Sequence, residues 1–173
     1  MKLWTVGHST HTLDAFMSLL APREIELLAD IRTVPKSRRS PHFNTDALAA
    51  SLPKSGVAYL HLPRLGGWRR GKADSPNGAW RNRSFRGYAD YATGDEFAEG
   101  LAELRDLAAA APTAIMCSEA LWWRCHRRLV ADHLTAGGDT VCHIGSDGRT
   151  SVHELTPFAV VARDGGVMYP AES

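Results

Sequence analysis

The sequence predicts one α/β domain, with a largely parallel central sheet, helices on both faces and short strands near the C-terminus. Two observations predict it. Short apolar runs alternate with stretches of helical spacing, as in repeated strand–helix units. The chain also has 173 residues, 44% of them apolar, which is enough to build one hydrophobic core. We therefore expect a single domain over residues 1–173.

Three apolar runs in the first half of the chain are expected as strands. They are LWTV at 3–6, ELLADI at 26–31 and VAYLHL at 57–62. A helix is expected between the first two, because apolar residues recur at the i, i+3, i+4 and i+7 positions. Those residues are Leu13, Phe16, Met17 and Leu20, with Ser9, Thr10 or Thr12 as the N-cap. A second helix over 44–56 is expected to be capped by Asn44 and to end near Gly56.

The second half continues the alternation. A helix over about 95–110 is followed by a strand at 113–117, a helix over 125–138 that glycines end, and a strand at 140–144. Short terminal strands are expected around an Asp-Gly-Gly turn within 153–170. Residues 63–94 show no periodicity and are expected to form a long basic loop, which in a compact domain is commonly functional.

Charge is distributed unevenly along the chain. Residues 32–86 carry twelve Lys and Arg against two acids, a net charge of +10, whereas the remainder carries −9. Such polarity indicates a face that meets an anion, while a solvated basic loop is the simpler explanation.

The composition also indicates in which cellular compartment the protein is expected. No apolar run reaches the roughly 18 residues of a membrane span, and the N-terminus does not resemble a signal peptide. The three cysteines are an odd number without the spacing of a disulfide scaffold. A cytoplasmic protein without a membrane partner is therefore expected.

Polar residues follow almost every expected strand. In parallel α/β sheets the carboxyl ends of the strands meet at one edge, where ligands bind. The residues concerned are Gly7, His8 and Ser9 after the first strand, Asp30, Arg32 and Arg38 around the second, Gly66 and Gly67 after the third, and Cys117, Glu119, Cys125, His126 and Arg127 around the fourth. The sequence thus predicts a polar site at this edge.

The same motifs resemble a known family. TVGHST, LLADIRTVPKSRRSPHF, the LGG at 65–67, MCSE and CHRRLVADHL occur in an order similar to the uncharacterised family called domain of unknown function 488. The resemblance extends to about residue 144. It implies an α/β domain of the cytosol and brings no established reaction.

An anion-binding site with acid and base groups is the first hypothesis. Glu119, His8 and Asp30 are the candidate catalytic residues, because their side chains can transfer protons. The other residues at the edge are candidates for substrate binding, since Arg32 and Arg127 can hold phosphate oxygens and the helix start near His126 offers N–H donors. The expected reaction is hydrolysis or group transfer on a nucleotide, nucleic acid or other phosphorylated substrate. A buried structural network of Asp30, Arg32, Glu119 and Arg127 is the alternative.

Two other kinds of site use the cysteines. Cys117, at a strand end before a helix, suits a nucleophile of the sulfurtransferase or phosphatase type. However, the loop after it lacks glycine, and Trp123 stands where such phosphatases place arginine. A metal site of Cys117, Cys125, His126 and His8 has the wrong spacing for known zinc motifs, so neither a metal nor another cofactor is predicted.

The last alternative is a non-enzymatic nucleic-acid-binding module. Arg69, Arg70, Arg81 and Arg83 are interleaved with Trp68, Trp80 and Phe85, a pattern that offers charges to phosphates and rings to bases. Such a module would bind in a salt-sensitive way and would not need Glu119. An exposed apolar hairpin at the C-terminus would also offer a route to a homodimer.

Overall fold

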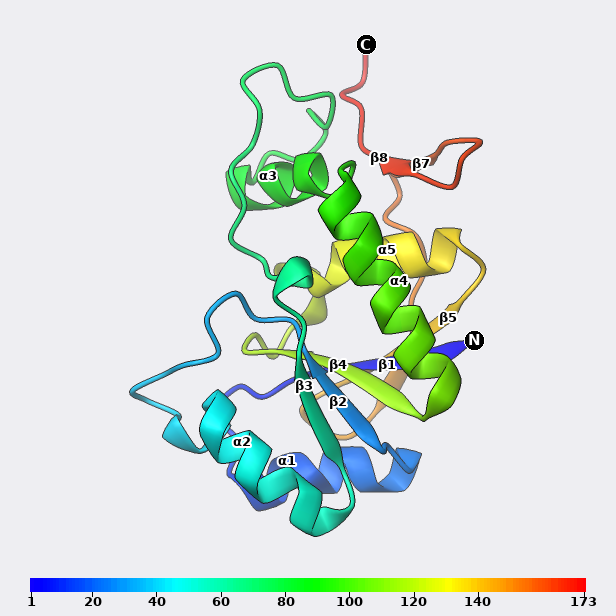
Figure 1. Ribbon diagram of the computed structural model, residues 1–173. Coiled ribbons are helices and arrows are strands. Elements are labelled where there is room, and N and C mark those ends of the chain that lie inside the picture. The colour runs from blue at the N-terminus through cyan, green and yellow to red at the C-terminus, as the bar shows by residue number, and fades with distance from the viewer.

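The computed structural model describes all residues, 1–173, and contains a six-stranded sheet (Figure 1). Its strands are β1 (Lys2–Gly7), β2 (Leu27–Asp30), β3 (Ala58–His61), β4 (Thr113–Cys117), β5 (Thr140–Ile144) and β6 (Thr150–Val152). Their order is β3-β2-β4-β1-β5-β6. The first five strands pair in parallel and β6 pairs antiparallel with β5. The expected largely parallel sheet is confirmed.

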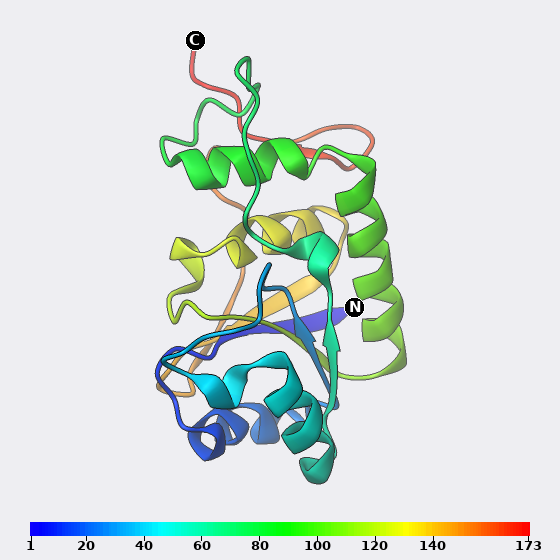
Figure 2. The same ribbon diagram turned by 60° about the vertical axis from the view of Figure 1, so that its left-hand side comes forward.

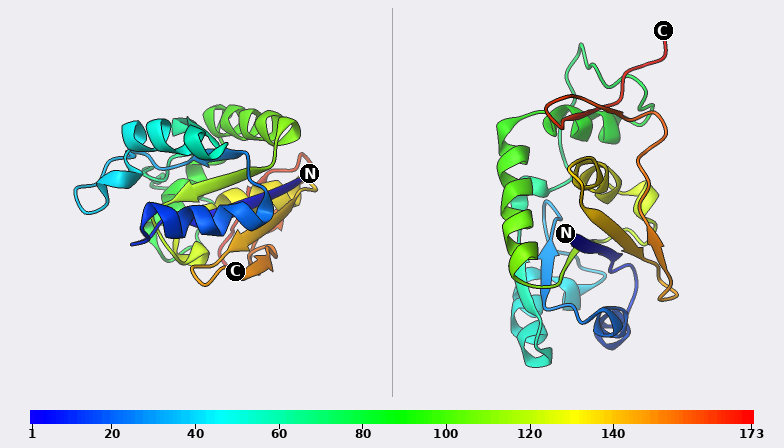
Figure 3. Two further views of the ribbon diagram at one scale, coloured as in Figure 1. Left: turned by 90° about the horizontal axis from the view of Figure 1, so that it is seen from below. Right: turned by 90° about the vertical axis from the view of Figure 1, so that its right-hand side faces the viewer.

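Helices cover both faces of the sheet, as expected. α1 (Leu13–Leu20) and α2 (Thr45–Ser51) lie below it in Figure 1, while α4 (Asp95–Ala110) and α5 (Arg127–Ala136) lie above it. Figure 2 and the right-hand view of Figure 3 show the same layers. One apolar core joins the sheet to α1 and α2, and a second joins it to α3 (Arg83–Tyr91), α4 and α5.

The helix starts follow the local sequence, with one difference. The Thr12 hydroxyl accepts a hydrogen bond from the Ala15 N–H and caps α1. Asn44 occupies the N-cap position of α2, but its side-chain oxygen accepts from the Ser37 N–H instead of from the helix. Asn44 therefore fixes the segment after β2. Gly56, with φ of 77°, ends the short 3₁₀ turn after α2.

The interval 63–94 differs from the expected loop because it contains α3. The side chain of Asn82 caps this helix by accepting from the N–H groups of Ser84 and Phe85. The sequence did not predict this helix, because Gly87 lies within it and glycine is a poor helix former. The glycine is needed there because a Cβ would lie 2.5 Å from the carbonyl oxygen of Arg69, where the chain crosses the helix.

Asp90 on α3 holds the remaining irregular chain. Its carboxylate accepts from the Lys72 N–H, the Ser75 hydroxyl and the Asn77 amide. Burial alone would raise the pKa of Asp90, but these three hydrogen bonds outweigh it and lower that pKa. This part of the long segment is therefore tied to the domain by a charged anchor.

The C-terminal part forms the expected hairpin around the Asp-Gly-Gly turn, with β7 (Val160–Val161) and β8 (Val167–Met168) antiparallel. Tyr169 follows it and donates its hydroxyl to the fully buried Asp132 of α5. The terminal strands were expected within residues 153–170, but β6 (Thr150–Val152) lies before this range. No helix has the length and apolar character needed to cross a membrane.

Candidate functional site

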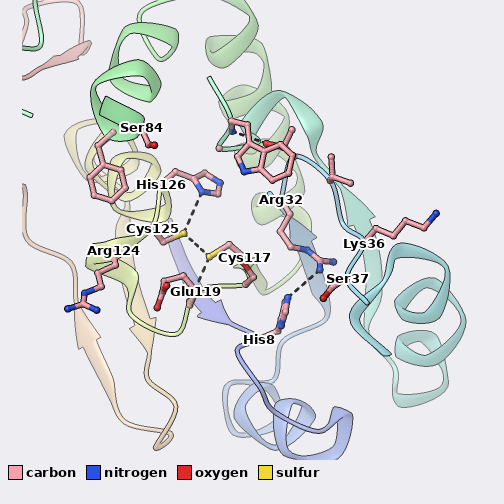
Figure 4. Close-up of a pocket in the computed structure, with 16 residues that line it drawn as sticks. His8, Arg32, Lys36, Ser37, Ser84, Cys117, Glu119, Arg124, Cys125 and His126 are labelled. Atoms are coloured by element: carbon pink, nitrogen blue, oxygen red, sulfur yellow. Dashed lines mark hydrogen bonds between the residues drawn. The ribbon is translucent and has the colours of Figure 1, made fainter. Parts of the chain in front are cut away.

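A cavity of about 460 Å³ opens at the carboxyl ends of β1, β2 and β4. Sixteen residues from these strand ends, α3 and the start of α5 line it (Figure 4). β4 lies between β1 and β2 in the sheet, and the chain leaves β4 toward a different face than it leaves those two strands. Ligands of open α/β sheets bind at such a position.

Eight of the site residues predicted from the sequence line this cavity or contact a residue that lines it. Those that line it are His8, Arg32, Gly67, Cys117, Glu119, Cys125 and His126, and Asp30 lies directly beneath Arg32. The side chains of Lys36, Ser37, Ser84 and Arg124 also line it, although the sequence did not mark them as site residues.

Arg32 is held by Asp30 beside the cavity. Its Nε and Nη2 atoms donate to the two carboxylate oxygens of Asp30 at 2.9 and 2.6 Å. Nη2 also donates to the carbonyl of Phe43, and Nη1 faces His8. Asp30 is fully buried and accepts a further hydrogen bond from the Tyr59 hydroxyl at 2.6 Å. These contacts engage Asp30 in positioning Arg32, so no oxygen of it is turned toward the cavity as a free base.

His8 presents its Nε2 atom to Arg32. Its Nδ1 atom donates to the Ser9 carbonyl at 2.9 Å, and Nε2 lies 3.3 Å from Arg32 Nη1. Burial lowers the pKa of His8, and the charge of Arg32 adds to this, while the bond to Ser9 opposes it. The ring is therefore neutral near pH 7. It stacks on Phe43 at 4.4 Å between ring centroids.

Cys117 and Cys125 meet at the floor of the cavity, where their Sγ atoms lie 2.7 Å apart (Figure 4). Cys117 is the last residue of β4, and Cys125 precedes α5. The turn between them carries a single 3₁₀ turn, Trp122–Arg124, which returns the chain to the strand end. All three cysteines are buried, and the third, Cys142, lies on β5 and does not line the cavity.

His126 is oriented toward Cys125. Its Nε2 atom donates to the Ile31 carbonyl at 2.8 Å, which leaves Nδ1 facing the Cys125 Sγ at 3.5 Å. Gly67 packs closely against this ring, and a Cβ there would lie 2.6 Å from Nδ1. A thiol, a base and a group that orients the base are the parts of an activated nucleophile.

The two thiols have opposite electrostatic surroundings. Burial raises the pKa of Cys117, and the neighbouring Cys125 raises it further. Burial would also raise the pKa of Cys125, but the S–H of Cys117 together with His126 and Arg127 lowers it well below its ordinary value. The Arg127 N–H also points at the Cys125 Sγ, at 3.4 Å. Of the two thiols, Cys125 therefore ionises more readily, with Cys117 as the thiol that donates to it.

Arg127 requires a correction. The sequence analysis predicted that its guanidinium binds the substrate. In the structure the side chain is fully buried and does not line the cavity. It donates to the carbonyl oxygen of Glu119 and to the Thr5 hydroxyl. Arg127 therefore ties the loop after β4 to β1. Its side chain does not line the cavity, but its charge lies close enough to lower the pKa of both thiols, and its backbone N–H points at Cys125.

Glu119 is exposed at the cavity wall, and one of its carboxylate oxygens accepts from the Leu121 N–H at 3.1 Å. The other oxygen is available to a ligand. Gly7 packs below this loop, where a Cβ would collide with the Glu119 carbonyl oxygen. Glu119 and Arg127 do not form the ion pair of the alternative network, because the contact of Arg127 is to the Glu119 backbone.

Three other predicted binding residues lie outside the cavity lining. Ser9 is half-buried, with φ of 45°, and contributes its carbonyl to His8. Gly66 packs on Thr33, which lies beside the cavity. Arg38 is exposed and does not line the cavity.

The basic residues of the long segment divide into two kinds. Arg69 is engaged within the fold, because its guanidinium donates to the Gly66 and Pro63 carbonyls and lies over the Tyr91 ring at 3.8 Å. Arg70, Arg81 and Arg83 are exposed and have no hydrogen-bond or ion-pair partner among the protein side chains. Of the four arginines proposed to bind nucleic acid, these three are therefore available to a partner.

Two features of the site could not be found from the sequence. The approach of Cys117 to Cys125 depends on the path of an irregular turn, although the CHR triplet before a helix is a signal for a thiolate at a helix start. The contact of His126 with the end of β2 depends on the strand order. No three His, Cys, Asp or Glu side chains gather in a way that would hold a metal ion.

Comparison with known proteins identifies the family. The model of the family described as domain of unknown function DUF488 matches residues 12–134, which include both cysteines, Arg32 and Glu119. The GHS motif at 7–9 and the strand at 140–144 lie outside the matched segment. No curated protein and no solved structure matches the chain. The chain belongs to the DUF488 family.

Proposed function

We propose that this protein is a group-transfer enzyme that binds an anionic substrate in the cavity at the strand ends. Phosphate-bearing compounds such as nucleotides are the first class to test. One observation carries the proposal: the fold brings Arg32, on β2's carboxyl side, together with the oriented pair Cys125 and His126.

The charge of the cavity favours an anion. Arg32, Lys36 and Arg124 line it, against the single carboxylate of Glu119. Lys36 and Arg124 lie on opposite flanks with their charged ends turned outward (Figure 4). Both side chains are exposed and flexible, so turning inward onto a bound anion costs little conformational strain. Arg32, fixed by Asp30, would supply the rigid part of the anion site.

The reacting group in this proposal is the Cys125 sulfur. Thiolate attack would form a covalent intermediate, and His126 would accept the thiol proton through Nδ1. The sequence suggested Cys117 as a nucleophile, but Cys125 has more stabilising donors. His126 would then return that proton to the leaving group, and Glu119, with one free oxygen, would act as the general base toward the acceptor.

Binding can be tested without knowing the reaction. Trp68 lines the cavity and is 76% exposed, so its fluorescence reports occupancy. Titration with inorganic phosphate and with adenosine monophosphate, each at two salt concentrations, should show saturable quenching. Lys36→Ala and Arg124→Ala should each weaken binding on the order of tenfold. Arg163→Ala, an exposed arginine in the β7–β8 turn, is the matched control.

A nucleic-acid-binding module is the second candidate, favoured by the exposed and unpaired Arg70, Arg81 and Arg83. Filter binding of a single-stranded oligonucleotide at two salt concentrations separates the two. If the protein is a nucleic-acid-binding module, its affinity for the oligonucleotide should fall when these three charges are reversed. The same affinity should not change in the Cys125→Ser variant. The enzyme requires the opposite pattern for its small anionic ligand, so the two proposals fail independently.

A further inference from the structure

We infer that Cys117 and Cys125 are a reactive dithiol that reduces a small anionic disulfide bound in the cavity. This inference rests on the proposed function, because it uses the same cavity and the same nucleophile. It adds the bond that reacts, the class of substrate and a role for Cys117.

The two sulfur atoms are already placed to bond with each other. Their separation of 2.7 Å is well inside ordinary contact between two thiols, while a disulfide bond is about 2.05 Å long. Closing that gap needs only a small side-chain movement. A single nucleophilic cysteine would not require a second thiol at this distance, on a different element of the fold.

The contacts of the two sulfurs differ and assign an order of reaction. Cys125 faces three groups that stabilise a thiolate, namely the Cys117 S–H, the Arg127 N–H and His126. Besides its hydrogen bond with Cys125, the Cys117 thiol has only a long contact, of 3.8 Å, with the carbonyl oxygen of Glu119. A carbonyl holds a thiol and not a thiolate. Cys125 therefore attacks first and Cys117 second.

The reaction has two balanced steps. In the first, the Cys125 thiolate attacks one sulfur of a substrate RS–SR, so that a Cys125–SR bond forms, the S–S bond breaks and RS⁻ leaves. In the second, Cys117 attacks the Cys125 sulfur, the Cys117–Cys125 bond forms and the second RS⁻ leaves, while the Cys117 proton passes to a leaving thiolate. The protein dithiol is oxidised by two electrons and the substrate disulfide is reduced. An external dithiol reductant returns the pair to its starting state.

Size and charge define the substrate. The thiols are only 2% and 5% exposed at the floor of a cavity of about 460 Å³. That volume suits a small molecule, and it keeps the folded surface of a protein disulfide at a distance. The basic flanks, Lys36 and Arg124, favour a disulfide that carries carboxylate or phosphate groups over a cationic one.

The experiment mixes the full-length reduced protein with glutathione disulfide, an anionic probe, and follows the products by mass spectrometry after acid quench. The wild-type protein should form the Cys117–Cys125 disulfide and release two glutathione thiols. Cys117→Ser should stop at one glutathione bound to Cys125. Cys125→Ser should take up none at Cys117, and Cys142→Ser should behave like the wild type. Cystamine, a cationic disulfide, should react about tenfold more slowly than glutathione disulfide.

The outcomes separate the two levels of the proposal. If wild-type protein keeps glutathione on Cys125 and forms no internal disulfide, the role of Cys117 is wrong while the nucleophile stands. If Cys125 reacts no faster than Cys142, the reactive dithiol and the Cys125 nucleophile are both wrong, whatever phosphate binding shows. Cys117→Ala, with its thermal unfolding measured by circular dichroism, checks that the serine result does not come from a damaged fold.

Discussion

The Nε2 atom of His126 donates to the carbonyl oxygen of Ile31 at 2.8 Å, and this bond decides which ring nitrogen faces Cys125. Ile31 directly follows β2, whereas His126 precedes α5, so the base is oriented by the sheet and not by its own helix. Arg32, the residue after Ile31, lines the same cavity as Cys125. The end of strand β2 therefore connects the proposed anion site with the proposed nucleophile.

The first prediction concerns the base. His126→Gln should slow alkylation of Cys125 by iodoacetamide at pH 7 by roughly tenfold, because the thiol loses its proton acceptor. Peptide mapping after timed alkylation measures the rate, and Cys142 in the same molecule is the internal control. An unchanged ratio of the Cys125 and Cys142 rates would contradict a role for His126.

A second prediction tests the position of that ring. A Cβ on Gly67 would lie 2.6 Å from His126 Nδ1, so Gly67→Ala must displace the imidazole. Cys125 alkylation should slow by roughly tenfold, since small misplacements of reacting groups have large effects on rate. Gly94→Ala is the matched control, because a Cβ there meets only the Tyr91 carbonyl oxygen at 3.3 Å, at the exposed start of α4.

Most of the fold was predictable because local pattern and burial agree. The strands at β1, β2, β3, β4 and β5 are apolar runs, and α1 and α4 have regular apolar spacing. α3 was not predictable from the spacing of apolar residues. Gly87 weakens its helical pattern, and this glycine is needed because the backbone at Arg69 passes close to the helix. A residue chosen for a distant contact weakens the local signal.

The edge that holds the site was predictable from strand polarity alone, but individual roles were not. Sequence cannot show which side of a helix start faces the ligand, so Arg127 was placed on the substrate although it is buried between β1 and the loop after β4. In the same way, Cys117 and Cys125 are eight residues apart, and only the turn between them determines that they meet.

The third prediction follows from the position of Arg127. Arg127→Met should reduce the free energy of unfolding by about 2–3 kcal/mol, because the Glu119 carbonyl and the Thr5 hydroxyl lose a charged donor. Urea unfolding followed by circular dichroism measures it, with the exposed Arg124→Met as control. A variant of normal stability that had lost only its anion affinity would instead restore the substrate-binding role.

The fourth prediction concerns the C-terminal segment. Asp132 is fully buried and accepts from the His153 ring, the Thr156 N–H and the Tyr169 hydroxyl. Asp132→Asn places an amide among these donors and should cost about 3 kcal/mol of stability. Hydrogen exchange should increase mainly over residues 153–169. Asp106→Asn, an exposed change on α4, should alter neither quantity, and uniform exchange in the Asp132 variant would contradict the anchoring role.

The last prediction is a loss of stability in mild acid. Burial lowers the pKa of His143 to about 3 and that of His133 to about 4, both from an ordinary value of 6.5. Between these values and pH 6.5 the unfolded chain binds protons that the folded chain does not, so stability falls as the pH falls. Each histidine should contribute a slope of about 1.4 kcal/mol per pH unit in that window. His133→Leu should remove one such contribution, since the His133 Nε2 has no hydrogen-bond partner to lose. Urea unfolding from pH 7 to pH 5 measures both slopes, and equal slopes for the two proteins would show that His133 becomes protonated within the fold.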